Sequence, residues 1–405
     1  MISSRPATEK DSIVGVMPKV VCLPDTVDEA AARIAESERI GESLAFVGGG
    51  TDIEIGSPPD RLDVVVRTER LDRVIEHAPS DQIISVEAGM TLTRLQSVVG
   101  AHGQRLALDP PLADRATIGG IIAANAFGPL RTRYGSVRDL IIGVSIIRAD
   151  GVIARGGGKV VKNVAGFDLP KLMVGSLGTL GMIATATFRL HPLPEVSETL
   201  LIKNQSASDL RNLMAEMKRM QLEAAAVAAI AAGPRFDIAV RFEGFHTGVV
   251  EQRERLRSLL AVCELLDPAG EQRFWRSHDE IRAAGPMRLK IAALPSAIEM
   301  AMHDVFPPLL GVLAGGGFVW YPTFGLGFLT GATKTDQEIA ASIRTARKTL
   351  VEAGGALTIE AAPSAVRKLA DSWGEPGAAL SLMRAMKQRF DPARRLSPGR
   401  FVGGI

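Results

Sequence analysis

The sequence has few of the cysteine and histidine residues that bind metal ions and iron–sulfur clusters in proteins. It contains two cysteines, Cys22 and Cys263, in 405 residues. Two cysteines cannot hold an iron–sulfur cluster, and without a Cys-x-x-Cys pair the chain has no zinc or thiol-redox motif. It also has only six histidines, and no two of them lie within eight residues of each other. The sequence therefore predicts no metal site of its own.

Charge of one sign and long apolar runs are also lacking. The formal net charge is +2, which gives no reason to expect nucleic acid or an anionic membrane as a partner. No apolar run reaches the roughly 18 residues that a membrane-spanning helix needs. The first ten residues are polar and lack the apolar core of a secretory signal. These absences predict a cytoplasmic protein with no transmembrane segment.

The first half of the chain is predicted to be α+β. Residues 1–18 are expected to be a poorly ordered, flexible leader. Residues 26–39 have acidic residues early and apolar ones at helical spacing, which predicts a helix. Several short segments rich in Val and Ile end in turn residues and predict strands, for example LIIGVSIIRADG and MIATATFRLHP. The strands are too irregularly spaced for the regular alternation of a doubly wound sheet.

The chain changes character after His191-Pro192-Leu193-Pro194, which is predicted to be a linker. From there, two successive rounds of strand, helix, strand, strand, helix, strand are predicted. Such rounds indicate a duplicated, ferredoxin-like sheet with helices on one face. The last segment, ALSLMRAMKQRFDPARRLSPGRF, predicts a helix, an Asp-Pro break and a Pro-Gly turn.

Glycine clusters follow the predicted strands of the first half. Residues 47–52 read VGGGTD, and consecutive glycines let several backbone N–H groups converge on one anion such as a pyrophosphate. A flexible turn is the alternative for this motif alone. The motif is neither GxGxxG nor GxxxxGK[ST], so it does not predict a Rossmann fold or a P-loop.

Two further glycine clusters bear on whether the first one is a ligand site or a flexible turn, and the second favours a ligand site. ATIGG at residues 116–120 precedes a run of small residues that ends at Gly128, and a stiff Asp109-Pro110-Pro111 comes before it. Such small side chains make a surface on which a flat ring or a phosphate chain can lie. The third cluster, GSLGTLG at residues 175–181, follows a helix that begins at Asp168, and its role is predicted to be mainly structural.

Taken together, these motifs resemble a known family. GGGT, DPP…ATIGG…AN…G…RYGSVRD, VVKNVAGFDLPKL and GSLGTLG are similar, in this order, to the FAD-binding domain of the vanillyl-alcohol oxidase / PCMH flavoproteins. Within them the chain resembles the D-lactate dehydrogenase and glycolate oxidase branch, and most of all the GlcE-type FAD-binding subunits of glycolate oxidase. The resemblance runs from about residue 21 to 193, and the tail RFDPARRLSPGRF resembles the C-terminal signature of that branch.

The resemblance implies a fold and domain limits. The fold class would be α+β, with a two-subdomain PCMH-type FAD-binding domain followed by a ferredoxin-like α+β cap domain. The leader at 1–18 would precede an FAD-binding domain at 19–194. The duplicated cap would occupy 195–385, and residues 386–405 would return to the FAD-binding domain.

The resemblance also implies the cofactor and its site. FAD would be bound noncovalently, because the first glycine loop offers Thr51 and Asp52 where some relatives have a histidine for covalent attachment. Arg131 and Arg133 could place a cation near the flavin, or could be solvated loop residues. The cofactor-binding residues implied for the pyrophosphate, the flavin and the ribityl path are Gly48, Gly49, Gly50, Thr51, Asp52, Pro111, Leu112, Thr117, Gly119, Gly120, Ala123, Asn125, Gly128, Tyr134, Gly135 and Ile183.

The histidine-rich motif of the catalytic relatives is missing. The family's GSEGTLG has Leu177 in place of the glutamate, and its GYDL and NPGR have Phe167 and Ser397 at the differing positions. Oxidation of a 2-hydroxy acid needs a cation for the carboxylate and a base for the hydroxyl proton. Arg276, His278 and Lys290 are the candidates. On a helix Arg276 and His278 would not share a face, and His278 is expected to be ordinary cap surface.

These observations favour one function and leave two alternatives. The first is an FAD-binding, electron-relaying subunit of a glycolate oxidase-like complex that oxidises glycolate to glyoxylate. Its partners would be a second, catalytic FAD-binding subunit and an iron–sulfur subunit, which could also hold it at the inner face of the membrane. The alternatives are a self-sufficient FAD-dependent D-2-hydroxy acid (D-lactate) dehydrogenase and a non-catalytic assembly subunit.

Overall fold

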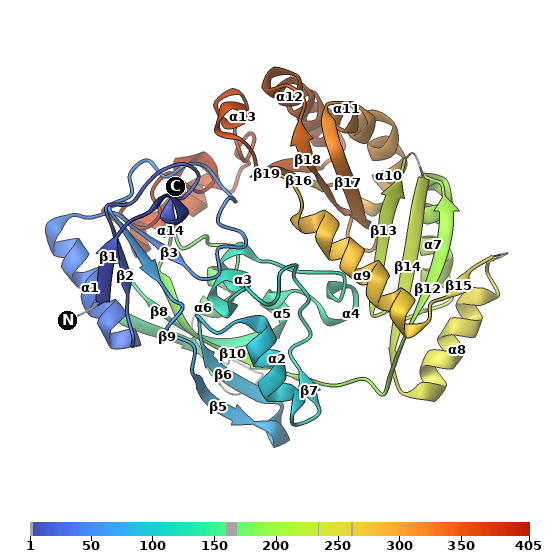
Figure 1. The fold of residues 1–405 in the computed structure, drawn as a ribbon, viewed down its shortest axis with the longest axis horizontal. Helices are drawn as coiled ribbons and strands as arrows, with labels where there is room; N and C mark the ends of the chain where they lie inside the picture. Colours follow the sequence, from blue (N-terminus) through green and yellow to red (C-terminus); the bar gives the residue numbers. More distant parts are fainter. Residues whose placement is uncertain (1–2, 159–167, 234, 261) are drawn as a thin grey trace. The chain divides into compact units, whose positions relative to one another are not determined.

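A computed structural model describes residues 3–158, 168–233, 235–260 and 262–405 (Figure 1). The predicted motif residues Gly166 and Phe167 lie outside the described part of the chain. Contacts between residues separate two units. The first unit comprises Met1–Phe127, Ser136–Leu193 and Glu375–Ile405, and the second comprises Gly128–Gly135 and Pro194–Gly374.

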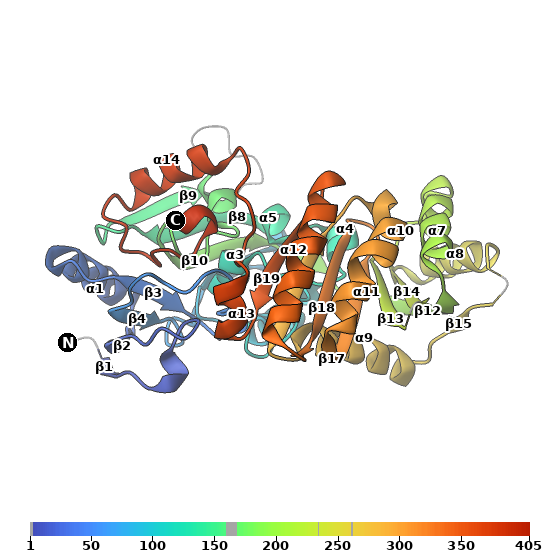
Figure 2. The same ribbon diagram turned by 90° about the horizontal axis from the view of Figure 1, so that it is seen from above.

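The first unit begins with a four-stranded sheet in the order β1-β2-β4-β3. Its strands are β1 (Ser3–Pro6), β2 (Val20–Leu23), β3 (Leu44–Val47) and β4 (Val64–Arg67). β2, β4 and β3 are parallel, and β1 is antiparallel to β2. Between β2 and β3 runs α1 (Val27–Ile40), which begins where the Thr26 hydroxyl accepts a hydrogen bond from the Glu29 N–H. Figure 2 shows α1 beside this sheet.

The expected flexible leader instead has defined structure in its described residues. β1 pairs with β2, and η1 (Glu9–Asp11) follows it. Ile13 and Val14 are 1% and 8% exposed and pack in one apolar cluster with Val21 and Val65. The leader therefore covers the face of the parallel sheet that α1 does not cover. A parallel sheet needs both faces covered, and this tertiary requirement is invisible in a short polar sequence.

The second sheet of the first unit is antiparallel, in the order β5-β6-β10-β8-β9. Residues from both sheets and from α1 share one buried cluster that includes Ile34, Val64, Ile147 and Ala184. The two sheets therefore share one core. The strands are β5 (Val74–Ala78), β6 (Ile83–Glu87), β8 (Ile141–Ile147), β9 (Ile153–Gly157) and β10 (Met182–Arg189).

Short helices and one small ladder complete this unit. β7 (Gln104–Arg105) pairs with β11 (His191–Pro192) just before the chain leaves for the second unit. The chain returns at Glu375, and the predicted C-terminal helix follows as α14 (Leu380–Phe390). The other helices are α2 (Leu92–Gly100), α3 (Ile118–Ala124), α5 (Val137–Leu140) and α6 (Leu169–Met173).

The second unit is built on an eight-stranded antiparallel sheet in the order β15-β12-β14-β13-β17-β18-β16-β19. In chain order, the rounds β12-α7-β13-β14-α8-β15 and β16-α10-α11-β17-β18-α12-β19 are separated by α9 and followed by α13. A short α4 (Arg131–Tyr134) is contributed by the first half of the chain. The strands are β12 (Val196–Gln205), β13 (Ala226–Ala232), β14 (Arg235–Gly244), β15 (Glu264–Leu265), β16 (Met287–Ala292), β17 (Leu313–Tyr321), β18 (Leu326–Thr333) and β19 (Ala356–Ala361).

Most helices of the second unit cover one face of this sheet, and α9 lies on the other (Figure 1). Trp320 meets Phe306 of α11 on the first face, and its neighbour Tyr321 meets His278 of α9 on the second. The sequence predicts the helical segments that contain α7, α8, α10, α11 and α12, but not α9 or α13. The helices are α7 (Ala207–Arg219), α8 (His246–Arg257), α9 (Pro268–Ala283), α10 (Ile298–Met300), α11 (Phe306–Gly311), α12 (Asp336–Glu352) and α13 (Ser364–Leu369).

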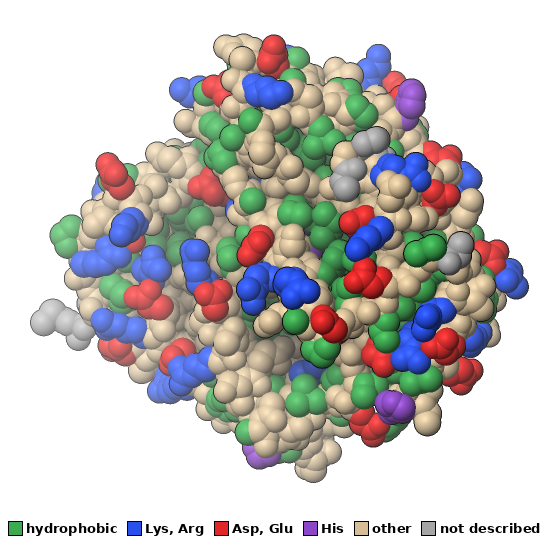
Figure 3. Space-filling model, turned by 45° about the vertical axis from the view of Figure 1, so that its right-hand side comes forward, with side chains coloured by type: hydrophobic (Ala, Val, Ile, Leu, Met, Phe, Trp, Pro, Cys, Tyr) green, Lys and Arg blue, Asp and Glu red, His purple; other side chains and the backbone are tan. Residues whose placement is uncertain are grey.

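The predicted fold class is confirmed. The chain is α+β: in its described residues the first unit contains two larger sheets and the two-stranded β7–β11 ladder, and the second repeats one βαββαβ pattern twice in a single sheet. Among the described residues, no helix is both long and apolar enough to span a bilayer. On the face drawn in Figure 3, Lys and Arg side chains are interspersed with Asp and Glu, as the small net charge predicts.

Candidate functional site

The first glycine loop, residues 48–52, continues directly from the end of β3. Gly50 has a φ of +71°, which turns the chain sharply. Among the described residues, none accepts a hydrogen bond from the backbone N–H of Gly48, Gly49, Gly50 or Thr51. Such a run of backbone donors, all in one loop, is suited to bind an anion.

The loop is packed tightly against residues 115–117. A Cβ on Gly48 would lie 2.0 Å from the Thr117 Oγ1, and one on Gly49 would lie 1.7 Å from the Arg115 carbonyl oxygen. Close approach between two backbones is therefore the reason for glycine at both positions. The two glycine clusters, which lie far apart in the sequence, form one structure.

Helix α3 begins at the second cluster. The Thr117 hydroxyl caps it by accepting from the Gly120 N–H at 3.3 Å. Its apolar side, with Ile118, Ile121 and Ile122, is buried in the unit. The opposite side carries Gly120 and Ala123, which are small and partly exposed. The helix therefore presents a surface of small side chains to a pocket.

The third cluster, residues 175–181, lies against the end of α3. The Gly175 and Leu177 N–H groups donate to the carbonyl oxygens of Ile122 and Ala123, at 2.9 and 3.0 Å. This brings Leu177 and Gly178 to the same pocket. The sequence predicts a mainly structural role for this cluster, and its place in the pocket wall is a difference from that prediction.

These loops enclose one pocket in the first unit. Of the predicted cofactor residues, those that line it are Gly48, Gly49, Gly50, Thr51, Asp52, Thr117, Gly119, Gly120, Ala123 and Ile183. Further lining residues, which are not in the predicted cofactor set, are Phe46, Thr68, Ala124, Leu177, Gly178, Gly181, Met182, Ser397 and Arg400, together with Ala45, Val47 and Ile53. Ser397 and Arg400 belong to the C-terminal motif that the sequence predicts to return to the FAD-binding domain, but the sequence assigns neither residue to the cofactor site.

The other predicted cofactor residues lie elsewhere. Pro111 and Leu112 belong to a turn in which Leu112 has a φ of +58°. Asn125 ends α3 with a φ of +51°, and its side-chain oxygen is buried with no hydrogen-bond partner among the described residues. A buried acceptor of this kind fits a nearby ligand. Gly128, Tyr134 and Gly135 belong to the second unit.

In the second unit, α4 carries Arg131 and Arg133, for which the sequence predicts either a place near the flavin or a solvated loop position. Arg133 donates to the Glu243 carbonyl oxygen at 2.6 Å, and the Tyr134 hydroxyl lies 3.5 Å from the Glu243 carboxylate. The Arg131 guanidinium lies over the Phe324 ring, 5.1 Å from its centre. These side chains therefore attach α4 to the sheet of the second unit.

The candidate catalytic residues are not brought together as a pair. Arg276 is exposed on α9, whereas His278 is fully buried, so the two lie on different sides of the helix. The expectation that His278 is ordinary surface is wrong, because α9 lies flat on the sheet and directs this side chain into it. Lys290 is a half-buried residue of β16, opposite Phe328 of β18.

His278 belongs to a buried polar cluster. Its Nε2 lies 2.7 Å from the Tyr321 hydroxyl, and its Nδ1 lies 2.9 Å from the Asp279 carboxylate. Arg282 donates to the Tyr321 hydroxyl at 3.1 Å and lies over the Phe328 ring. Burial lowers the pKa of His278, although Asp279 opposes the shift, so the imidazole is neutral at pH 7. No group of three or more His, Cys, Asp or Glu in the described residues could hold a metal ion.

Comparison with known protein families identifies the domain that contributes most of the pocket. Residues 18–157 match the family FAD_binding_4, the FAD binding domain. The chain contains a PCMH-type FAD-binding domain. The predicted cofactor, FAD, is thereby confirmed. The loop with unused N–H donors and the surface of small side chains fit a pyrophosphate and a flat ring system.

Several proteins of known name resemble the chain. D-lactate dehydrogenase of Archaeoglobus fulgidus is 34% identical over 204 residues, 50% of this chain and 45% of that protein. Glycolate oxidase subunit GlcE of Escherichia coli is 33% identical over 216 residues, 53% of this chain and 59% of the subunit. The chain therefore spans about half the length of these relatives. D-2-hydroxyglutarate dehydrogenase of Xanthomonas citri pv. viticola is 25% identical over 432 residues, 95% of this chain and 89% of that enzyme.

Solved structures support the fold alone. p-Cresol methylhydroxylase with substrate bound superimposes with a TM-score of 0.74 at 14% identity, covering 95% of this chain and 89% of that one. At so low an identity the likeness concerns the architecture and not the chemistry.

Proposed function

We propose that this protein is the FAD-binding, electron-relaying subunit of a glycolate oxidase-like complex that oxidises a small 2-hydroxy acid. The observation that carries the proposal is the FAD pocket of the first unit, in a chain similar to glycolate oxidase subunit GlcE. The resemblance to a D-lactate dehydrogenase supports the same substrate class. In this proposal glycolate is converted to glyoxylate by the complex.

The proposed partner subunits supply the two features that this sequence lacks, an iron–sulfur cluster and the catalytic histidine motif. Two cysteines cannot ligate an iron–sulfur cluster, so an iron–sulfur subunit would take up the electrons. The histidine-rich motif of catalytic relatives is absent from the sequence, so a second FAD-binding subunit would carry the oxidation of substrate. The flavin of this chain would then relay electrons, and the complex would lie in the cytoplasm or at the inner face of the membrane.

A second candidate is a self-sufficient FAD-dependent D-2-hydroxy acid dehydrogenase. It is favoured by the similarity to D-2-hydroxyglutarate dehydrogenase, which extends over 95% of this chain and 89% of that enzyme. The second unit also holds cationic and polar side chains of the required kinds, in Arg282, Tyr321 and His278. A guanidinium can bind a carboxylate through two parallel hydrogen bonds, and a neutral imidazole can accept a proton.

In either case the residues of the first unit hold and orient the cofactor. When bound, FAD would supply an electron acceptor: for electrons from the partner subunit in the first proposal, or for a hydride from the substrate carbon in the second. The N–H groups of residues 48–51 would bind the pyrophosphate, and the small residues of α3 would leave room for the ribityl chain. The apolar wall with Leu177, Met182 and Ile183 would exclude water from the isoalloxazine ring.

The test is anaerobic reduction of the purified chain. Its flavin absorption would be followed after addition of glycolate, D-lactate or D-2-hydroxyglutarate, with sodium dithionite as the control that the flavin is reducible. The subunit proposal expects oxidised flavin that is reduced by dithionite, and by substrate only after partner subunits are added. Bleaching by a 2-hydroxy acid in the single chain would reject the relay role and support the dehydrogenase. No reduction by substrate under either condition would reject both.

A further inference from the structure

The C-terminal segment, residues 391–400, contributes to the FAD pocket. Its Ser397 and Arg400 line the pocket together with the glycine loops. Among the described lining residues, Arg400 is the single Lys or Arg, and Asp52 is the single carboxylate. The glycine loops offer N–H donors but no positive charge. The cationic side chain of the pocket therefore comes from the opposite end of the sequence.

Arg400 is held in a fixed position. It is 3% exposed, and its Nη2 donates to the Ile53 carbonyl at 2.7 Å and to that of Ile55. The Arg400 carbonyl accepts from the Ser57 N–H at 3.0 Å, and the Pro398 carbonyl accepts from the Asp60 N–H at 2.9 Å. The segment thus runs along the residues that follow the first glycine loop. A guanidinium fixed in this way loses little entropy when it binds a ligand.

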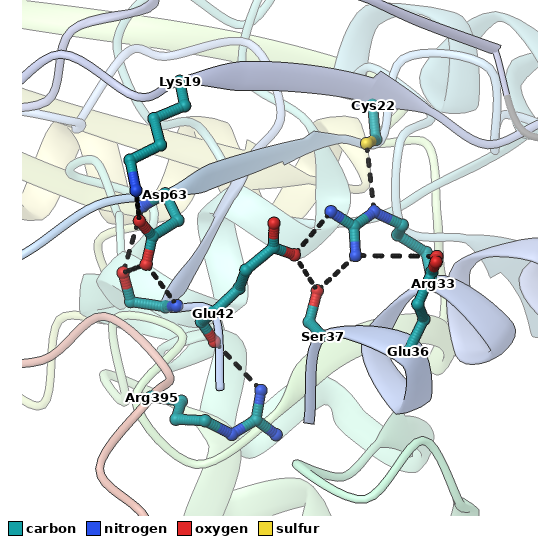
Figure 4. A network of polar contacts seen from close by, with 9 residues as sticks. Lys19, Cys22, Arg33, Glu36, Ser37, Glu42, Asp63 and Arg395 are labelled. Atoms are coloured by element: carbon teal, nitrogen blue, oxygen red, sulfur yellow. Dashed lines mark hydrogen bonds and ion pairs between the residues drawn. The ribbon is translucent and has the colours of Figure 1, made fainter. Parts of the chain in front are cut away.

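The rest of the segment is anchored to the sheet that carries the loop. Leu44 of β3 donates to the Arg395 carbonyl at 2.8 Å, and Ser397 donates to the Leu44 carbonyl at 2.7 Å. Arg395 also donates to the carbonyls of Glu42 and Ala149. Figure 4 shows the contact of Arg395 with Glu42, whose carboxylate accepts from Arg33 in turn.

A buried ion pair fixes the turn at the start of the segment. Lys387 donates to the Asp391 carboxylate at 2.8 Å, to the Leu396 carbonyl at 2.8 Å and to the Thr179 carbonyl at 2.9 Å. Asp391 accepts from the backbone N–H groups of Arg395 and Leu396. Since Thr179 belongs to the third glycine cluster, the pair joins the segment to a second wall of the pocket.

Electrostatics then assign a role to Arg400. The pyrophosphate of FAD carries two negative charges, and a nearby cation stabilises an anion that is partly removed from water. Asp52 in the same lining would make the local field less favourable. We propose that Arg400 is the counter-charge for the FAD pyrophosphate, and that residues 391–400 are the part of the chain that holds it in the pocket. This rests on FAD as the cofactor and not on the identity of the substrate.

The test measures binding to the deflavinated full-length chain. Dissociation constants are determined for FAD, for ADP, which carries the pyrophosphate, and for riboflavin, which does not. Arg400→Gln is expected to weaken FAD and ADP roughly ten- to a hundredfold, the usual loss of a hydrogen-bonded charge, and to leave riboflavin unchanged. Arg400→Lys keeps the charge and should lose less. Raising the salt concentration should weaken FAD binding in the wild type more than in Arg400→Gln.

Arg394 offers a matched control in the same segment. It is exposed, donates to the Gly404 carbonyl, and does not line the pocket. Arg394→Gln should bind all three ligands as the wild type does. Equal losses of riboflavin and ADP in Arg400→Gln, an unchanged salt dependence of FAD binding, or a loss as large in Arg400→Lys as in Arg400→Gln would overturn the proposal, because each would mean that Arg400 only supports the loop.

Discussion

Lys387 and Asp391 form a buried ion pair, 2.8 Å apart, in which the two side chains are 4% and 0% exposed. Each is surrounded by hydrogen-bond partners from the backbone of the first unit. Burial lowers the pKa of Lys387, and Asp391 opposes that shift by favouring the charged form. The pair is stable because both charges are satisfied, and this makes it sensitive to the loss of either one.

Replacing Lys387 with Met should destabilise the protein by roughly 3–5 kcal/mol, because Asp391 would remain buried without a cation. The measurement is the free energy of unfolding in urea at pH 7. Lys171 and Asp168 offer a matched control, since this pair is about half exposed. Lys171→Met should cost less than about 1 kcal/mol. Equal losses of unfolding free energy in Lys387→Met and Lys171→Met would show that burial of the ion pair does not determine its contribution.

Ala123 should be a sensitive position for the cofactor. It lies on the pocket side of α3, and a large side chain there would occupy the space of FAD without disturbing the buried side of the helix. Ala123→Phe is expected to abolish the yellow colour while the protein stays folded. Flavin absorption and circular dichroism measure the two properties. Ser97→Phe, on the exposed side of α2 and outside the pocket lining, should keep its flavin; a yellow Ala123→Phe would show that the pocket is misassigned.

Gly49 and Gly50 should respond differently to the same substitution. A Cβ on Gly49 would meet the Arg115 carbonyl oxygen, whereas one on Gly50 has nothing within 4 Å. Gly49→Ala should therefore separate the two glycine loops and lose FAD. Gly50→Ala should cost only about 1 kcal/mol, from its positive φ. FAD content and melting temperature would be compared, and a Gly49→Ala protein with wild-type FAD affinity would refute the packing argument.

His278 should make stability depend on pH. Its pKa is lowered by burial, so the folded protein keeps the imidazole neutral at a pH where the unfolded chain protonates it. Stability from this group is complete above the unfolded pKa of about 6.5 and falls as the pH drops below it. His278→Gln should flatten the pH dependence of the unfolding free energy between pH 7 and 5. His303→Gln, at an exposed histidine that also contacts an aspartate, is the control and should change nothing.

Local patterns in the sequence determine much of the fold. The two βαββαβ rounds could be predicted because each buried strand and amphipathic helix carries its own periodicity. The order of the strands in the eight-stranded sheet has no such signal. Helix α9 could not be predicted, because only Trp275 and His278 of its side chains are buried and more than half of the others are polar or charged. Similarly, Ile13 and Val14 are too few to indicate the sheet face that they cover.

In the cofactor site, too, some features could be predicted from the sequence and others depend on the tertiary structure. The sequence by itself predicted FAD through the resemblance of its motifs to a flavoprotein family, and it indicated two glycine loops, because a backbone that approaches a phosphate or another backbone requires glycine. Only the tertiary structure decided that Gly49 faces Arg115, that the third cluster lines the pocket, and that Arg400 supplies its cation. Arg400 and the Ile53 carbonyl that holds it are 347 positions apart, and long-range contacts of this kind leave no periodic mark in the chain.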